Sequence, residues 1–371
     1  MRALVVIGTR PEAIKLAPLV HALAAEPGFS VRTCVTSQHT DLLTPMLAFF
    51  GLRPDFDLRV MTPGQTLSRV TTRVLQGMDD LLAADTYDLV IVQGDTTTAF
   101  AAGLAAFYHH VPVAHVEAGL RSGDLARPWP EEGNRRLADV LAAYLLAPTA
   151  GARANLLAEG YPAARVFVTG NTGIDALLLA ANIVRKQARP LRVQLPQGAR
   201  LALVTAHRRE SFGEGLRRIC TALAALLERY PDLHLLYPVH PNPNVVAATD
   251  ELLRGRPRVH LVAPLEYPDF VRALIDADVI LTDSGGVQEE APALGKRVLV
   301  MRETTERPEG IDAGAAELVG TDVDCIVSRA GALLDGAGAG QPVVSPYGDG
   351  HAVERIVEVL RTGALARPFG G

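Results

Sequence analysis

Short runs of apolar, mostly β-branched residues alternate with longer amphipathic stretches along the whole chain. In the first half the apolar runs predict strands at 3–7, 31–36, 89–93 and 112–116, with a weaker one at 144–147 and a short one that Thr169 closes. In the second half they predict strands at 201–205, 233–239, 258–262, 278–282 and 297–301. Amphipathic stretches between them predict helices, for example at 11–25, 67–83, 97–108, 149–159, 214–229 and 286–294. Apolar strands that alternate with helices indicate parallel sheets covered on both faces.

The length of the chain favours two domains. At 371 residues it exceeds the size of about 250–300 residues at which one hydrophobic core stops growing. The two halves have similar lengths and similar numbers of predicted strands. We therefore predict an α/β fold of two doubly wound, Rossmann-like domains that face each other across a central cleft. The first spans 1–169, the second spans 170–349, and the C-terminal segment, about 350–371, packs back on the first domain.

Composition and charge exclude several classes of protein. A formal net charge of −5 leaves no basic excess for a nucleic-acid partner. No apolar run reaches the about 18–20 residues that span a bilayer, so we expect no membrane partner. The first apolar run is too short for a signal-peptide core. The three cysteines, Cys34, Cys220 and Cys325, are odd in number and far apart, which is typical of core thiols in a reducing cytoplasm.

The segment 279–290 is typical of an anion-binding corner. An apolar strand is followed by Ser284, Gly285 and Gly286, and then by a helix. Glycines let backbone N–H groups approach a phosphate, and the helix N-terminus adds partial positive charge. Glu290, about one turn into the helix, is placed to bind a ribose hydroxyl, as acids do in dinucleotide-binding folds. Most Gly pairs are plain turns, but this one shares its half of the chain with two other polar motifs, so we expect a nucleotide diphosphate.

Two loops of the first half end strands with candidate functional groups. Strand 3–7 is followed by Arg10 and, one turn further on, Lys15, which suit a diphosphate. The alternative for both is a solvated helix start. Strand 89–93 is followed by Asp95, which is either a helix N-cap or an acid/base group at the cleft. The residue alone leaves these two interpretations open.

The strand 112–116 leads into a third loop with charged residues. His115 and Glu117 are two apart and are expected on the same face of the strand. This spacing permits a metal pair, but no third ligand follows at a recognisable interval, so we predict no metal site. Glu117 stands between apolar neighbours, which suits a general acid or base. Glu131 and Glu132 open the next helix, where favourable interaction with the helix dipole is a sufficient structural explanation.

Three further positions in the second half are candidates. His207 and Arg208 follow strand 201–205 and suit a diphosphate better than a core. For His240, structural and ligand-binding interpretations are equally open. Phe270 is placed to lie beside a base, although a core position is the more common role for such a ring.

These motifs, taken together, resemble one family. They are Gly8-Thr9-Arg10-Pro11-Glu12-Ala13-Ile14-Lys15, Gly94-Asp95-Thr96-Thr97, His115-Val116-Glu117-Ala118-Gly119-Leu120-Arg121, Ala206-His207-Arg208-Arg209-Glu210 and Asp283-Ser284-Gly285-Gly286-Val287-Gln288-Glu289-Glu290. In this order they resemble the bacterial non-hydrolysing UDP-N-acetylglucosamine 2-epimerases. The resemblance extends over nearly the whole chain and includes Arg307. It implies a glycosyltransferase-B-type fold, a homodimer, and interconversion of UDP-GlcNAc and UDP-ManNAc without an added cofactor.

The resemblance also implies a mechanism and roles for residues. The family is understood to eliminate UDP, to form 2-acetamidoglucal and then to add UDP back. The implied catalytic residues are Asp95, Glu117, Glu131, His207 and Lys15. The implied substrate-binding residues are Arg10, Phe270, Ser284, Gly285, Gly286, Glu290 and Arg307. A regulatory UDP-GlcNAc site is implied at Gln38, Arg208 and His240. Which carboxylate removes the proton and which returns it stays open.

Three other functions compete with this interpretation. A hydrolysing 2-epimerase would release UDP and free ManNAc after the same elimination. A glycosyltransferase of the same architecture would transfer the sugar, although three candidate carboxylates favour elimination. A non-enzymatic nucleotide-sugar sensor would not need Lys15, Asp95, Glu117, Glu131 and His207 together.

Overall fold

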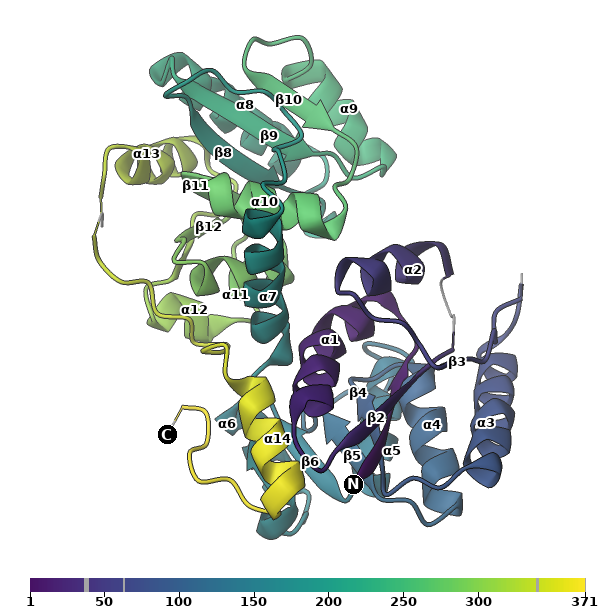
Figure 1. Cartoon of the computed structure of the whole chain (residues 1–371). Coiled ribbons are helices and arrows are strands. Elements are labelled where there is room, and N and C mark those ends of the chain that lie inside the picture. Colours follow the sequence, from purple (N-terminus) through teal and green to yellow (C-terminus); the bar gives the residue numbers. More distant parts are fainter. Residues whose placement is uncertain (37–39, 63, 338–339, 371) are drawn as a thin grey trace. The chain divides into compact units, whose positions relative to one another are not determined.

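The computed structural model of the chain describes residues 1–36, 40–62, 64–337 and 340–370 (Figure 1). The chain divides into two compact units. Unit 1 consists of Met1–Ala176 and Gly348–Gly371, and unit 2 consists of Leu177–Tyr347. Each unit is described by itself below.

Unit 1 is built on a seven-stranded sheet in the order β3-β2-β1-β4-β5-β6-β7, and every strand pair in it is parallel. Its strands are β1 (Arg2–Ile7), β2 (Ser30–Val35), β3 (Phe56–Asp57), β4 (Leu89–Gln93), β5 (Val113–Val116), β6 (Tyr144–Ala147) and β7 (Val166–Val168). Its helices are α1 (Arg10–Ala25), α2 (Thr40–Phe49), α3 (Leu67–Ala84), α4 (Thr97–Tyr108), α5 (Glu131–Leu141), α6 (Ala150–Ala158), the 3-10 turn η1 (Ala163–Arg165) and α14 (Ala352–Thr362). The helix α7 (Thr172–Lys186) begins in unit 1 and continues into unit 2.

Unit 2 has a six-stranded parallel sheet in the order β10-β9-β8-β11-β12-β13. Its strands are β8 (Arg200–Thr205), β9 (Leu233–Pro238), β10 (Val259–Val262), β11 (Val279–Thr282), β12 (Val298–Val300) and β13 (Ala316–Leu318). Its helices are α8 (Glu214–Arg229), α9 (Pro243–Leu252), α10 (Tyr267–Asp276), α11 (Gly285–Ala293), α12 (Pro308–Asp312) and α13 (Val323–Leu334), with the 3-10 turn η2 (Arg209–Ser211).

The predicted fold class is confirmed in each unit, because both sheets are parallel and doubly wound. Every predicted strand is present, and its ends differ from the prediction by no more than one residue. The central strands are buried on both faces, as their continuous apolar runs require: residues 3–7 of β1 are at most 1% exposed. The predicted strands did not include the short strands β3 and β13. The helices α2, α9, α10, α12 and α13 are not among those given above as examples.

Two of the three cysteines occupy the positions expected of core thiols. Cys34 lies in the core of unit 1 and Cys220 in the core of unit 2. Burial raises the pKa of each of these two thiols to about 12. Cys325 is half-buried, and all three are free. Among the described residues, none of the helices is both long enough and apolar enough to cross a bilayer.

The C-terminal helix α14 belongs to unit 1, where it packs against α1. Its N-cap residue, His351, makes no side-chain cap hydrogen bond. Asp175, in the first turn of α7, supplies that cap instead: its carboxylate accepts the N–H of Val353 at 2.9 Å and that of Ala352 at 3.3 Å. One buried carboxyl therefore joins the last helix of the chain to the start of α7.

Asp175 gives a pH-dependent stability with a definite sign. Burial raises its pKa from 3.8 to about 6, against the opposing effect of the two backbone N–H groups. Its stabilising contribution is therefore complete below pH 3.8 and is lost as the pH rises through 6. Asparagine does not titrate. We therefore expect the unfolding free energy of Asp175→Asn to rise by about 2–3 kcal/mol relative to that of the wild type as the pH increases from 4 to 7. Urea unfolding of both proteins across this range measures the difference.

The exposed cap Asp322 provides a matched control for that experiment. Its carboxylate accepts the N–H of Cys325 at 2.8 Å at the start of α13, so Asp322→Asn also removes a helix-capping carboxylate. If the unfolding free energies of the wild type and Asp175→Asn differ by the same amount from pH 4 to pH 7, Asp175 does not titrate as described.

Candidate functional site

The strand order of each sheet places its functional loops at one edge. In unit 1 the order reverses between β1 and β4, and in unit 2 it reverses between β8 and β11. Ligands of open α/β sheets bind beyond the carboxyl ends of the strands at such a reversal. The loops after β1, β4 and β5 therefore form the candidate site of unit 1, and the loops after β8, β11 and β12 form that of unit 2.

The backbone at Glu117 is unusual and directs its side chain. The strand β5 ends at Val116, and Glu117 has a φ of 70°, in the left-handed region that costs a non-glycine residue about 1–3 kcal/mol. The N–H groups of Glu117 and Ala118 both donate to the carbonyl of Leu146, at 3.0 and 3.2 Å. This pairing with β6 holds the turn. Strain that neighbouring structure maintains in this way is a mark of functional sites.

The turn brings the Glu117 carboxylate to polar partners. Lys15 Nζ lies 2.5 Å from Oε2, and the side-chain amide of Gln93 donates to the same oxygen. The predicted apolar surroundings of Glu117 are therefore wrong. The strand alternation behind its expected shared face with His115 does not extend to Glu117, because β5 ends at Val116 and Glu117 lies in the left-handed turn beyond it. His115 itself is fully buried against Asp139. The structure does bring together Lys15 and Glu117, which the sequence had placed in separate motifs.

Asp95 is not the N-cap of α4. The cap is Thr96, whose hydroxyl accepts the N–H of Ala99 at 3.1 Å. Asp95 instead forms an ion pair with Arg135 of α5, and its backbone carbonyl accepts a hydrogen bond of 3.0 Å from the side chain of Asn134. Of the two interpretations left open by the sequence, capping is excluded.

The backbone amides of the loop between β1 and α1 are used within the fold. The N–H groups of Gly8 and Thr9 donate to the buried carboxylate of Glu12, at 2.7 and 2.5 Å, and the Thr96 hydroxyl donates to it at 2.6 Å. Burial raises the pKa of Glu12, and these hydrogen bonds oppose the rise. The amides therefore face inward. Arg10 is half-exposed and makes no hydrogen bond or ion pair within the described part of the chain, so its side chain is what this loop offers a ligand.

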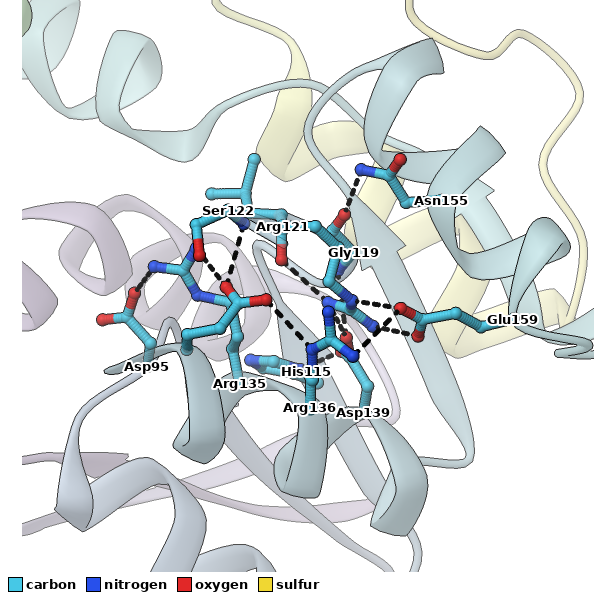
Figure 2. A network of polar contacts seen from close by, with 12 residues as sticks. Asp95, His115, Gly119, Arg121, Ser122, Arg135, Arg136, Asp139, Asn155 and Glu159 are labelled. Atoms are coloured by element: carbon cyan, nitrogen blue, oxygen red, sulfur yellow. Dashed lines mark hydrogen bonds and ion pairs between the residues drawn. The ribbon is translucent and has the colours of Figure 1, made fainter. Parts of the chain in front are cut away.

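Figure 2 shows a polar network that runs from Asp95 along α5. Its first part centres on Glu132, which is fully buried, and which accepts the Ser122 N–H at 3.0 Å, Arg136 at 3.0 Å and Arg135 at 3.3 Å. Burial alone would raise the pKa of Glu132, but these donors hold it below its usual value. Arg135 joins Glu132 to Asp95.

The second part of the network centres on Asp139, which is also fully buried (Figure 2). It accepts His115 Nδ1 at 2.6 Å, Arg121 at 2.8 Å and the Gly119 N–H at 3.2 Å. Burial opposes the protonated form of His115, but the charge of Asp139 and hydrogen bonds outweigh it and raise the His115 pKa. Because His115 Nε2 donates to the carbonyl of Gly94 at 2.7 Å, this buried ion pair also fixes the turn before Asp95.

The third predicted carboxylate, Glu131, stands apart from this network. It opens α5, is partly exposed, and makes no hydrogen bond or ion pair with the residues that the structure describes. Its neighbour Glu132 does have a structural role, as the sequence suggested, but through hydrogen bonds and ion pairs in the network rather than through the helix dipole alone. Glu131 is therefore the one left facing outward from the first turn of the helix.

In unit 2, Arg307 lies directly over the N-terminus of α11. A Cβ on Gly285 would meet the guanidinium carbon of Arg307 at 2.5 Å, so only glycine permits this approach. Arg307 is held by Glu289, whose carboxylate lies 2.6 Å from its Nε. Ser284 is the N-cap residue and makes no side-chain cap hydrogen bond. The structure thus brings together Ser284, Gly285 and Arg307.

A buried arginine joins the two polar loops of unit 2. Arg302 is 6% exposed and pairs with Glu210 at 2.5 Å and with Glu306 at 2.7 Å. Glu210 belongs to the loop after β8, and Glu306 to the loop that carries Arg307. The Arg302 hydrogen bond lowers the pKa of Glu306 to about 2. Arg302 was not predicted, and it ties together the loops that hold His207 and Arg307.

His207 lies at the end of β8 beside three other polar groups. Its backbone N–H and that of Arg208 both donate to Asp283, each at 2.6 Å. Its ring stacks on His240 with centroids 5.5 Å apart, and Nδ1 of His240 accepts the Asn242 N–H at 3.1 Å. Burial lowers the pKa of His207, an effect that Asp283 opposes.

The remaining predicted residues differ in their exposure. Phe270 is half-buried on α10, Gly286 is exposed, and Glu290 is half-buried on α11. Gln38 lies outside the described residues. Within the part of the chain that the structure describes, no group of three or more His, Cys, Asp or Glu side chains is arranged to hold a metal ion.

Comparison with known proteins places this arrangement in a family. The model of the UDP-N-acetylglucosamine 2-epimerase family matches residues 21–361. The chain belongs to this family. A UDP-N-acetylglucosamine 2-epimerase of Yersinia pestis is 50% identical over 97% of the chain and 98% of that protein. One of Escherichia coli strain K12 is 49% identical over 99% of the chain and 100% of that protein.

A solved member of the family has the same fold. The crystal structure of UDP-GlcNAc 2-epimerase from Neisseria meningitidis bound to UDP-GlcNAc is 42% identical and covers 97% of this chain and 100% of its own, with a TM-score of 0.88. The predicted family and the glycosyltransferase-B type of fold are therefore confirmed.

Proposed function

We propose that this protein interconverts UDP-GlcNAc and UDP-ManNAc by eliminating UDP and adding it back. The observation that carries the proposal comes from the loops of unit 1: the strained turn at Glu117 presents a carboxylate held by Lys15 and Gln93, and Asp95, which follows the neighbouring strand β4, is held by Arg135. Family membership supports the substrate, since a 42% identical relative was crystallised with UDP-GlcNAc bound.

The chemistry accounts for these residue types. In the elimination, a base takes the proton from C2, the C1–O bond breaks with its electron pair going to UDP, and a C1–C2 double bond forms. In the addition, a UDP oxygen attacks C1 and an acid delivers a proton to the opposite face of C2. A single carboxylate cannot reach both faces, so two groups are needed. Neither step requires a redox cofactor.

We assign these proton transfers to the carboxylates of Asp95, Glu117 and Glu131. Lys15 supports Glu117, and His207 interacts with the departing diphosphate. Cationic donors at the β-phosphate stabilise the charge that develops as UDP leaves. In unit 2, Arg307 supplies such charge from the loop after β12; in unit 1, Arg10 is the cationic side chain offered by the loop after β1.

We assign the nucleotide to the edge of unit 2. Ser284, Gly285 and Gly286 at the start of α11 would receive a phosphate, with Arg307 above them. Glu290 would bind a ribose hydroxyl and Phe270 would lie beside the uracil. A further UDP-GlcNAc would bind for regulation at Gln38, Arg208 and His240.

The nucleotide assignment makes Gly285→Ala a sharp test. The new methyl group would displace the Arg307 guanidinium, which is the flexible end of a side chain, so folding is expected to persist. A hydrogen bond to a charged group is worth about 1.5–3 kcal/mol, so we expect UDP affinity to fall about tenfold to hundredfold. Calorimetric titration with UDP measures this. Gly215→Ala, in a helix of the same unit with only ordinary contacts around the added methyl, is the matched control. Equal UDP affinity in both variants would remove Arg307 from the nucleotide site.

The product mixture tests the function itself. We expect UDP-GlcNAc incubated with the protein to give UDP-ManNAc, followed by proton NMR, until the two nucleotide sugars reach equilibrium. Accumulation of UDP with free ManNAc would show a hydrolysing 2-epimerase instead. Transfer of GlcNAc to an added acceptor, with no change at C2, would show a glycosyltransferase.

We also propose that the protein is a homodimer that works in the cytoplasm. The helices α4 and α5 pack together, and Phe107, Tyr108, Leu137 and Val140 on them are 48–63% exposed, which is unusual for large apolar side chains. The free cysteines agree with a reducing compartment. Light scattering tests the dimer: Val140→Asp is expected to shift the mass toward the 39.5 kDa of one chain.

A further inference from the structure

Asp283 is a fully buried carboxylate whose two oxygens have different surroundings. It is the first residue after β11. Oδ2 accepts the backbone N–H groups of His207 and Arg208, each at 2.6 Å. These bonds connect the ends of the two strands, β8 and β11, between which the order of the unit 2 sheet reverses. One oxygen of Asp283 therefore has a clear structural role.

The other oxygen has no such role. Oδ1 is buried and makes no hydrogen bond with any residue that the structure describes, and it lies 3.5 Å from Nδ1 of the His207 ring. A buried carboxylate oxygen without a donor costs free energy, and native proteins rarely keep one without a reason. A small rotation of the imidazole would bring Nδ1–H to the about 2.8 Å of a charge-assisted hydrogen bond. A ring nitrogen 3.5 Å from the unsatisfied oxygen thus belongs to a residue assigned to the diphosphate.

We propose that Asp283 is a positioning residue for His207: it accepts Nδ1–H, so that Nε2 faces the diphosphate, and it stabilises the doubly protonated ring when UDP is bound. The assignment of the diphosphate rests on the function proposed above. A carboxylate that holds one ring nitrogen of a histidine sets the tautomer and orientation of the other.

The charges around His207 explain why the second proton would arrive with the ligand. Burial, the stacked ring of His240 and the adjacent Arg208 all disfavour protonation of His207, and only Asp283 favours it. A bound diphosphate adds negative charge on the Nε2 side. His207 would then take one proton from solvent onto Nε2 and donate it in a hydrogen bond to the β-phosphate oxygen that leaves C1. UDP binding is therefore linked to uptake of a proton.

The test uses UDP alone, so that it does not depend on turnover. Nitrogen-15 NMR of labelled histidine, with His207→Gln used to assign the signal, is expected to show His207 as the Nδ1–H tautomer in the free wild-type protein. UDP titrations in buffers of different ionisation enthalpy are expected to show uptake of up to one proton per site. An Nε2–H tautomer in the free wild-type protein, or binding without proton uptake, would overturn the proposal whatever the variants do.

Asp283→Asn separates positioning from a merely structural role. The asparagine oxygen still accepts the two backbone N–H groups, while its NH₂ group donates to Nδ1 and so should switch His207 to the Nε2–H tautomer. We expect the proton uptake to disappear and UDP affinity to fall about tenfold to hundredfold, as on loss of other residues that orient a histidine. A loss of affinity with the tautomer and proton uptake unchanged would mean that Asp283 only holds the loop, and would overturn the proposal.

Asp278→Asn is the matched control. Asp278 stands just before the same strand, at its opposite end, and its carboxylate also accepts a backbone N–H, that of Leu201, at 2.7 Å. It is expected to leave the tautomer and UDP binding unchanged. If the protein epimerises UDP-GlcNAc but Asp283→Asn, like Asp278→Asn, leaves the His207 tautomer and UDP binding unchanged, the role of Asp283 is wrong and the proposed function stands. If the protein does not epimerise UDP-GlcNAc but the His207 tautomer switches in Asp283→Asn, the function proposed above is wrong and the role of Asp283 toward His207 stands.

Discussion

Glu117→Gln is expected to slow exchange of the C2 hydrogen with solvent about 10²–10⁴-fold, the usual range for loss of a general acid or base. Glutamine keeps the size of the side chain and can still accept a hydrogen bond from Lys15 or Gln93, so the turn should persist. What it loses is the ability to take or return a proton. UDP affinity should be nearly unchanged, because the nucleotide is assigned to unit 2.

The measurement follows deuterium incorporation at C2 of UDP-GlcNAc in D₂O by NMR. Asp79→Asn is the control: it also removes a carboxylate that is in an ion pair in unit 1, here an exposed one with His109, and exchange should proceed at the wild-type rate. Wild-type exchange in Glu117→Gln would exclude Glu117 from the proton transfers.

Asp139→Asn is expected to lower the free energy of unfolding by about 3–5 kcal/mol, the usual cost of removing one partner from a buried ion pair. Asp139 is fully buried between His115 and Arg121. Without its charge, both cationic groups lose their buried counter-ion. The Gly94 turn before Asp95 would lose its support, because His115 holds it.

Urea unfolding of the variant and the wild type gives this difference. The chain offers a close control, since Asp79 and His109 form a second Asp–His pair at 2.7 Å, compared with 2.6 Å for Asp139 and His115, but on the surface. Exposed pairs contribute about 0–1 kcal/mol, so Asp79→Asn should be nearly neutral. Equal losses in the two variants would show that burial of the Asp139 network adds nothing.

The sequence predicted the sheets well because their strands are continuous apolar runs. It could not predict β3, which has two residues, or β13, whose three residues, Ala316–Leu318, include a charged one. Both are edge strands, and their pairing depends on the neighbouring strand more than on their own side chains. The same apolar runs indicated which loops to consider as candidate sites, since residues that follow parallel strands meet at one edge of the sheet.

The geometry within these loops was less predictable from the sequence. The left-handed turn at Glu117 depends on the carbonyl of Leu146 from another strand. The inward amides of Gly8 and Thr9 depend on the burial of Glu12. One signal was available: Glu132, Arg135 and Arg136 have the i, i+3 and i, i+4 spacing of helical ion pairs, which indicates a structural role for Glu132.

The central claim is that UDP leaves C1 while the proton leaves C2. The most direct test labels UDP-GlcNAc with oxygen-18 in the bridge between C1 and the β-phosphate, and follows the label by phosphorus NMR. If the C1–O bond breaks, the freed β-phosphate rotates, and the account predicts that label appears in non-bridging positions in both recovered nucleotide sugars. Formation of UDP-ManNAc with all of the label still in the bridge would contradict it.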